Sequence, residues 1–214
     1  MEIGLVNMNP TKKIPETFLR TLHSLSCRVH WIHCNDYSKE EIRDIIESSQ
    51  IRKWIFTGSP ANVYDVKSPQ VSLDLLNLAN KELFLICYSM ESILHQLGIP
   101  VIKRTVNKKE FFTLDTIPTK VCSSSLQGLS KRGTFMRNHH YYTPSEATQG
   151  IQGITLLASH ENEAMILSYK NSILTQFHPE KSDDGKQILF NWIYGNNLPW
   201  NNLYGIHPIY NTKV

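Results

Sequence analysis

Short apolar runs alternate with amphipathic segments over the first hundred residues. Four short, largely apolar runs are strand candidates: residues 3–6, 29–32, 53–57 and 83–86. The segments between them carry apolar residues at helical spacing. Strands and helices in this order predict an α/β domain with a mixed, mostly parallel sheet and helices on both faces.

Each expected helix has its own apolar stripe. The four stripes are Phe18, Leu19, Leu22 and Leu25; Ile42, Ile45 and Ile46; Val71, Leu75 and Leu78; and residues 88–97 before Gly98 and Pro100. The first helix should end near Ser26. Ser38 and Glu41 have the spacing of a capping box and predict the start of the second helix.

The second half has a different pattern, with short strand-like runs separated by turn residues. These runs are residues 109–115, 120–123, 154–159, 165–169 and 173–177. We expect them to add antiparallel strands to the same sheet. A last helix, capped by Ser182, Asp183 or Asp184, should bury Phe190 and Trp192.

This pattern predicts one domain over residues 1–195 and an irregular extension over residues 196–214. The aromatic residues of the extension either form a docking surface or pack on the domain: Trp200, Tyr204 and Tyr210.

Composition and charge exclude several classes of protein. Apolar residues make up 41% of the chain and charged residues 19%, which is typical of a globular protein. The net charge of +3 is spread along the chain, whereas a nucleic-acid binder gathers positive charge on one face. The apolar runs are far shorter than the roughly 20 residues of a membrane-spanning helix, and no secretory signal is visible at the N-terminus. We therefore expect neither nucleic acid nor membrane as a partner.

The cysteines indicate a reducing compartment. Cys27, Cys34, Cys87 and Cys122 show no paired short spacing, which predicts free thiols and a cytoplasmic location. The run from Cys27 through His30 and His33 to Cys34 has some likeness to a metal site. Side chains alternate along a strand, so these ligands would point to opposite sides, and we predict no metal here.

Cys87 is the first candidate for chemistry. It lies between an apolar strand and a helix, at a turn that would lift its thiol out of the sheet. The helix N-terminus supplies partial positive charge, which favours the reactive thiolate. The alternative is a small buried hydrophobe, the usual role of a free cysteine. Ligands of open parallel sheets bind beyond the carboxyl ends of the strands, where residues 57–60, 138–140 and 176–180 are also expected.

His178 and Glu180 are the partners that a cysteine nucleophile needs. The imidazole takes the thiol proton and returns it to the leaving amine, while a carboxylate fixes the tautomer of the ring. Pro179 ends the strand, so we expect the pair to lie in a turn. Taken alone, a His-Pro-Glu tripeptide is also typical of an ordinary surface turn.

Four motifs occur in a distinctive order. Leu-Ile-Cys-Tyr-Ser-Met at residues 85–90 and Thr-Gln-Phe-His-Pro-Glu at residues 175–180 are the most specific. Gly-Ser-Pro and Val-Tyr-Asp fall within residues 58–65, and Asp-Gly-Lys-Gln-Ile-Leu leads into Asn-Trp-Ile-Tyr over residues 184–194. Together they resemble the class I (triad-type) glutamine amidotransferases, in particular the GMP synthetase branch. The resemblance covers residues 2–195 and implies a flavodoxin-like amidotransferase fold.

The resemblance also implies roles for individual residues. It makes Cys87 the nucleophile, His178 the base and Glu180 the residue that orients the base. It places the oxyanion donors at the backbone N–H groups of Ser59 and Tyr88. The substrate-binding residues that it implies are Gly58, Glu91, His139, His140 and Tyr141. It requires neither a metal nor a cofactor.

Five positions near these residues depart from the family pattern. Glycine is usual at the positions of Leu85, Ser89, Ser59 and His140, and glutamine at the position of Glu91. A carboxylate at this last position either opposes a substrate carboxylate or pairs with a substrate ammonium group. The triad is complete while its surroundings differ. The substrate is therefore free glutamine, a γ-glutamyl peptide or another amide.

The leading hypothesis is a stand-alone glutaminase module that supplies ammonia to a separate ATP-dependent synthetase of the GMP synthetase type, in purine biosynthesis. The chain has no Gly-x-x-x-x-Gly-Lys phosphate loop of its own. A γ-glutamyl peptidase or hydrolase is the enzymatic alternative. A regulatory or interaction subunit that retains the fold with little activity is the third.

Overall fold

The structure is a computed structural model, and it describes residues 1–11, 16–115 and 132–195. The expected strand at residues 120–123, Cys122 and the extension over 196–214 with its three aromatic residues lie outside the described residues. No described helix is long and apolar enough to cross a membrane.

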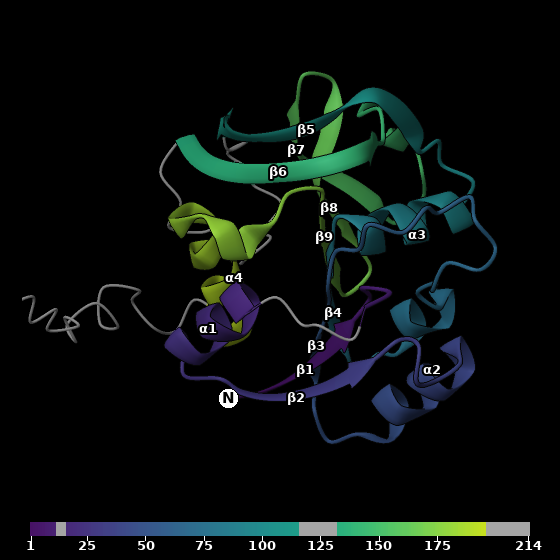
Figure 1. The fold of residues 1–214 in the computed structure, drawn as a ribbon, viewed down its shortest axis with the longest axis vertical. Coiled ribbons are helices and arrows are strands. Elements are labelled where there is room, and N and C mark those ends of the chain that lie inside the picture. Colours follow the sequence, from purple (N-terminus) through teal and green to yellow (C-terminus); the bar gives the residue numbers. More distant parts are fainter. Residues whose placement is uncertain (12–15, 116–131, 196–214) are drawn as a thin grey trace, which may run out of the picture.

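A seven-stranded sheet forms the centre of the molecule, in the order β2-β1-β3-β4-β9-β8-β7 (Figure 1). Its strands are β1 (Glu2–Asn7), β2 (Arg28–His33), β3 (Lys53–Phe56), β4 (Glu82–Ile86), β7 (Ile154–His160), β8 (Glu163–Tyr169) and β9 (Ser172–Thr175). Pairing is parallel from β2 to β9, and β8 and β7 are antiparallel additions. The predicted mixed, mostly parallel sheet is confirmed.

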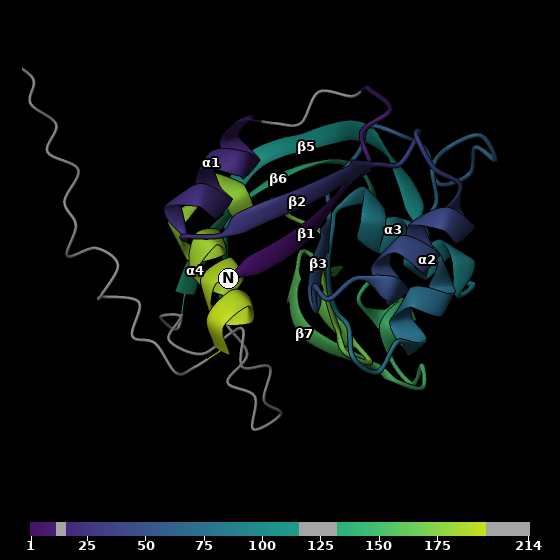
Figure 2. The ribbon, with the colours of Figure 1, turned by 90° about the horizontal axis from the view of Figure 1, so that it is seen from below.

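Helices cover both faces of this sheet (Figure 2). One layer holds α1 (Glu16–Ser24) and α4 (Asp183–Tyr194), and the other holds α2 (Lys39–Ser48) and α3 (Tyr88–Gln96). Successive residues of β4 enter opposite cores: Phe84 packs in the α1/α4 core and Leu85 in the α2/α3 core. A strand that is buried on both faces has apolar residues at consecutive positions, and this run made β4 recognisable as a strand in the sequence.

The predicted helix caps are present. The Ser38 hydroxyl accepts from the Glu41 N–H at 3.1 Å, and the Glu41 carboxylate accepts from the Ser38 N–H at 2.7 Å. Of the three candidates ahead of α4, Ser182 is the cap, and it accepts from the Gly185 N–H. Phe190 and Trp192 are buried as expected.

The expected helix through Val71, Leu75 and Leu78 is wrong. The structure has only a 3-10 turn there, η1 (Leu73–Asn77). Val71 precedes the turn, and Leu78 follows it in an extended conformation. Leu75 is buried from the 3-10 turn itself, while Val71 and Leu78 lie outside it, so helical spacing here did not require an α-helix.

Residues 101–142 contain the second correction. β5 (Ile102–Asp115) and β6 (Arg132–Tyr142) form a separate two-stranded antiparallel sheet, so residues 109–115 do not extend the main sheet. β9, which overlaps the run 173–177, pairs antiparallel with β8 but parallel with β4. No apolar pattern marked β6 as a strand, because its buried face includes the polar residues Arg137 and His139. A 3-10 turn, η3 (Glu146–Thr148), follows β6.

Candidate active site

Cys87 occupies a sharp bend between β4 and α3. Its backbone has φ 50° and ψ −108°, in the positive-φ region that non-glycine residues rarely adopt. The Cys87 N–H donates to the Thr175 carbonyl at 2.7 Å, and the Cys87 carbonyl accepts from the Glu91 N–H at 3.0 Å. Such a conformation costs about 1–3 kcal/mol and persists where the surroundings hold it. Strand β9 and the first turn of α3 hold it here.

Two departures from the family pattern are accommodated around this bend. Leu85 is fully buried in the α2/α3 core. Ser89 is also fully buried, and its hydroxyl donates to the Thr57 carbonyl at 2.7 Å. Ser89 therefore ties the first turn of α3 to the end of β3, where the loop with Gly58 and Ser59 begins.

His178 and Glu180 lie in the expected turn, η4 (Pro179–Lys181), which follows β9. His178 Nδ1 is 3.0 Å from Glu180 Oε1, and the Glu180 side chain is only 3% exposed. The His178 N–H donates to the Met136 carbonyl of β6 at 2.9 Å. The turn is thus fixed by the two-stranded sheet as well as by its own side chains.

Gly58 shows how close His178 comes to Cys87. A methyl group built on Gly58 would lie 2.9 Å from His178 Cε1 and 3.3 Å from Cys87 Cβ. Only a residue without a side chain fits between the ring and the cysteine. With Nδ1 directed at Glu180, His178 Nε2 is left on the side of Gly58 and Cys87.

These residues share one cavity of about 450 Å³. All the predicted site residues except Tyr88 line it: Gly58, Ser59, Cys87, Glu91, His139, His140, Tyr141, His178 and Glu180. The Tyr88 ring is buried elsewhere, and its hydroxyl donates to the Pro69 carbonyl at 2.5 Å. Its backbone N–H favours the thiolate of Cys87, so only the main chain of Tyr88 acts at the site.

The structure adds three residues to which the sequence assigned no role, although Asn138 falls in the expected segment 138–140. Asn107 and Asn138 line the cavity and are joined by a hydrogen bond of 3.0 Å. The Asn138 carbonyl lies 3.9 Å from Cys87 Sγ, and the Gln176 amide nitrogen lies 3.8 Å from the same sulfur. No local signal marked Asn107, because it lies at an irregularity of β5 between Lys103 and Lys108. Gln176 was expected only to lie near a strand end.

Burial dominates the electrostatics of the cavity. It raises the pKa of the Cys87 thiol well above its ordinary value, and the Glu91 carboxylate raises it further. Glu91 is 3% exposed, and burial raises its pKa to about 7 although the Gln176 amide donates to it at 2.8 Å. Near neutral pH this carboxyl group therefore exists in both protonation states.

His139 is a neutral histidine in the wall of the cavity. Burial lowers its pKa to about 4. Its Nδ1 is 2.5 Å from the Tyr141 carbonyl, so the ring proton lies on Nδ1 and Nε2 carries none. Within the described part of the chain, this Nε2 is buried without a hydrogen-bond partner, 3.8 Å from Glu163 Oε2.

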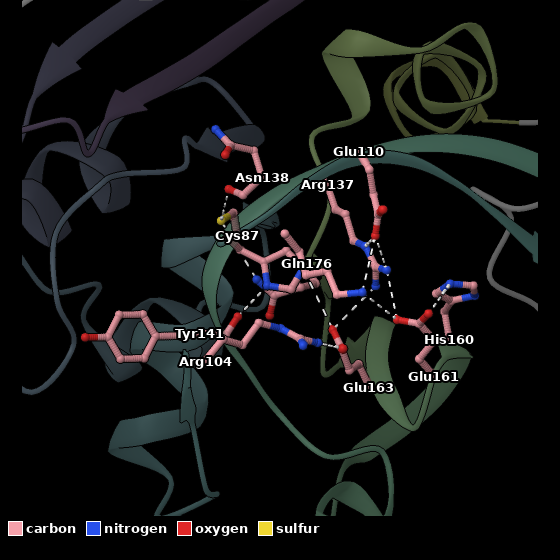
Figure 3. A network of polar contacts seen from close by, with 12 residues as sticks. Cys87, Arg104, Glu110, Arg137, Asn138, Tyr141, His160, Glu161, Glu163 and Gln176 are labelled. Atoms are coloured by element: carbon pink, nitrogen blue, oxygen red, sulfur yellow. Dashed lines mark hydrogen bonds and ion pairs between the residues drawn. The ribbon is translucent and has the colours of Figure 1, made fainter. Parts of the chain in front are cut away.

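A network of charged side chains holds the part of β6 that lines the cavity (Figure 3). Arg137 is 1% exposed, and it contacts Glu110 Oε1 at 3.0 Å and Glu161 Oε2 at 2.9 Å. Glu163 lies 3.8 Å from Arg137 and is paired with Arg104. The network joins β5, β6 and the β7–β8 hairpin, and so fixes the strand that carries Asn138 and His139.

The cysteine–histidine run near β2 has other contacts. His30 is exposed beside Glu2, whereas His33 is buried and its Nε2 lies 2.8 Å from the Asn9 carbonyl. Across the described ranges, no three His, Cys, Asp or Glu side chains are arranged to hold a metal ion.

Comparison with known proteins gives a consistent result. The model of the family "Glutamine amidotransferase class-I" matches residues 10–195. Proteins named "GMP synthase [glutamine-hydrolyzing]" are similar: that of Finegoldia magna is 28% identical over 165 residues, and that of Aquifex aeolicus is 30% identical over 182 residues. The matches cover 76% and 83% of this chain but 31% and 32% of the relatives, so the chain spans about a third of their length.

Solved structures share the fold. A protein from Thermoplasma acidophilum, described as a putative GMP synthase subunit, has a TM-score of 0.66 at 19% identity, covering 90% of this chain and 92% of its own. The glutaminase domain of Trypanosoma brucei CTPS, solved with bound acivicin, has a TM-score of 0.66 at 10% identity, covering 93% and 96%. At these identities the likeness concerns the fold.

Proposed function

The chain belongs to the class I glutamine amidotransferase family, and we propose that it hydrolyses the side-chain amide of glutamine through a thioester on Cys87. One observation carries the proposal. Cys87 is held at a strained bend in the same cavity as His178, whose other ring nitrogen is bound to the buried carboxylate of Glu180. A nucleophile, a base and an orienting group gathered in one cavity form the arrangement that acyl transfer requires.

The reaction proceeds in two halves. His178 Nε2 takes the proton of the Cys87 thiol as Sγ bonds to the amide carbon, since burial disfavours a free thiolate beforehand. The N–H groups of Ser59 and Tyr88 stabilise the oxyanion of the tetrahedral intermediate. The C–N bond then breaks, ammonia leaves with the proton held by His178, and a thioester remains. Water, deprotonated by His178, attacks the thioester, which releases glutamate and restores the thiol.

The remaining cavity residues bind the amino-acid end of the substrate. We assign this role to Gly58, Glu91, His139, His140 and Tyr141, all of which line the cavity. Glu91 provides a carboxylate, and because this group is buried it binds a polar substrate with little competition from bulk water.

We further propose that the ammonia is consumed by a separate ATP-dependent synthetase chain of the GMP synthase type, in purine biosynthesis. The names of the relatives support this, as does the 92% coverage of the Thermoplasma acidophilum protein. The thiols of Cys27, Cys34 and Cys87 are free, which agrees with a cytoplasmic location.

A γ-glutamyl peptidase or hydrolase is the second candidate. The observation that favours it concerns the proposed substrate-binding residues. Glu91 and His140 both line the cavity, and both depart from the family pattern. It uses the same Cys87, His178 and Glu180.

Ammonia and glutamate release from glutamine tests these alternatives, with Cys87→Ala as the control. Release by the wild type that is lost in Cys87→Ala supports the proposed glutaminase. Turnover of γ-glutamyl peptides alone supports the second candidate. Labelling of Cys87 by electrophiles without turnover of glutamine or γ-glutamyl peptides refutes both enzymatic candidates. That result supports a regulatory or interaction subunit that retains the fold.

A further inference from the structure

Glu91 is a buried acid in direct reach of the proposed nucleophile. It lies one helical turn after Cys87 in α3, and its N–H bonds to the Cys87 carbonyl at 3.0 Å. The Gln176 amide nitrogen is 2.8 Å from Glu91 Oε1 and 3.8 Å from Cys87 Sγ. One carboxamide therefore bridges the carboxylate and the sulfur, as the close-up in Figure 3 shows for Gln176 and Cys87.

No positive charge balances Glu91. None of the described Lys, Arg or His side chains forms an ion pair with it, and its hydrogen-bond donor, Gln176, is neutral. The titratable groups that feel its charge are Cys87, Tyr88 and Tyr141. Each of them is neutral or negative.

Charges on a second element, η4, also act on Cys87. Glu180 of η4 opposes ionisation of the thiol, and Lys181 favours it. The Tyr88 N–H also favours it. Burial and the two carboxylates prevail over Lys181 and the N–H, so in the empty cavity the thiol is held in its protonated form.

A buried carboxylate with a free side facing a cavity attracts a cation. Glutamine carries an ammonium group four bonds from its amide carbon. The contacts of Gln176 with Glu91 Oε1 at 2.8 Å and with Cys87 Sγ at 3.8 Å set an upper limit on the separation of those two atoms, and an amide with an ammonium group four bonds away can span it. An ammonium group docked here neutralises the one carboxylate of α3 that opposes the thiolate.

We propose that Glu91 makes the ionisation of Cys87 depend on the charge of the cavity's occupant. In the empty cavity its carboxylate suppresses the thiolate, and the ammonium group of a bound substrate removes that suppression. The inference rests on the proposed function, because it takes Cys87 as the nucleophile. It extends that function by defining the substrate class: amides with a free ammonium group, and not N-acylated or deaminated analogues.

The first experiment measures alkylation of Cys87 by iodoacetamide against pH, without substrate, in the full chain. Mass spectrometry of the Cys87 peptide separates it from the other cysteines. In Glu91→Gln we expect the midpoint of labelling to fall by about one pH unit or more, because a nearby negative charge is removed. Glu91→Asp keeps the charge and should keep most of the high midpoint. Equal midpoints in Glu91→Gln and wild type overturn the proposal.

The second experiment compares two amides that each keep half of the amino-acid end. 4-Aminobutanamide retains the ammonium group without the carboxylate, and glutaramate retains the carboxylate without the ammonium group. We expect the wild type to prefer 4-aminobutanamide in kcat/KM by about tenfold or more, and Glu91→Gln to lose that preference. A ratio near one in the wild type overturns the proposal without recourse to any variant.

The two experiments separate the inference from the function on which it rests. If the wild type releases ammonia from no amide, the glutaminase proposal fails, while the labelling profiles still decide whether Glu91 controls Cys87. If the wild type hydrolyses glutamine and neither the midpoint nor the ratio depends on Glu91, the inference fails alone. A melting curve of each variant confirms that it is folded.

Discussion

Glu91→Gln should change how stability depends on pH. Burial raises the pKa of Glu91 from 4.5 to about 7, so the folded state binds this proton more tightly than the unfolded chain does. The resulting stabilisation is complete below pH 4.5 and is lost as the pH rises through 7. A difference of 2.5 pH units at 1.36 kcal/mol each corresponds to about 3 kcal/mol. Glutamine keeps the shape and the acceptor for Gln176 but does not titrate.

The variant should therefore gain about 3 kcal/mol of unfolding free energy relative to wild type between pH 4.5 and pH 8. In a chain of this size that corresponds to roughly 6–12 °C in Tm. His139 has the opposite effect: its lowered pKa, about 4, gives stability above pH 6.5 that is lost as the pH falls through 4. The contributions of Glu91 and His139 to the pH dependence of the unfolding free energy partly cancel in the wild type. Only the difference between variant and wild type therefore isolates the contribution of Glu91.

Urea unfolding of both proteins at several pH values from 4.5 to 8 measures this difference. Staying below pH 8 keeps the thiol of Cys87, whose pKa is raised well above 9, out of the comparison. Glu40→Gln, an exposed carboxylate on α2, is the matched control and should run parallel to wild type. Parallel curves for Glu91→Gln, with a difference that changes by less than about 1 kcal/mol, would refute the burial argument.

Three further substitutions test the geometry. Gly58→Ala places a methyl 2.9 Å from the ring of His178, so glutaminase activity should fall by about 100-fold with little change in Tm; unaltered turnover contradicts the tight fit. Arg137→Met removes a buried guanidinium whose partners Glu110 and Glu161 are half-exposed, and should cost about 1–3 kcal/mol in urea unfolding through the lost charged hydrogen bonds, whereas a cost below about 0.5 kcal/mol would show the network to be dispensable. Gly185→Ala drives a methyl to within 2.6 Å of Pro179 Cα, and should lower both Tm and turnover because α4 packs directly on the turn; a normal Tm argues against this contact.

Much of the fold was predictable because its signals are local. The runs at residues 3–6, 29–32, 53–57 and 83–86 became four parallel strands. Those at the centre of the sheet, β1, β3 and β4, are covered on both faces and are therefore mainly apolar, whereas β2 is a largely exposed edge strand. The bend at Cys87 was also predictable from a local signal, because the apolar strand is followed by a helix with only one residue between them. The turn at His178 followed from Pro179.

The sheet of β5 and β6 was not predictable in this way. Its buried face includes the polar residues Arg137, which pairs with carboxylates outside β6, and His139, which bonds to the Tyr141 carbonyl, so the sequence shows no hydrophobic pattern there. The helix expected through Leu75 failed because apolar spacing records which residues are buried and not the backbone that carries them.

Local patterns along the chain were enough to predict the main strands, helices on both faces of the sheet and the candidate reactive residues, because each of these signals depends on neighbouring residues. Only the tertiary structure decided which groups surround the sulfur. Parallel pairing of β4 with β9 brings Gln176 and His178 beside Cys87 across about ninety residues, and the separate sheet adds Asn138. The electrostatics of Glu91 and Cys87 follow from that enclosure, since a pKa responds to burial and to charges in space, which residue order does not specify.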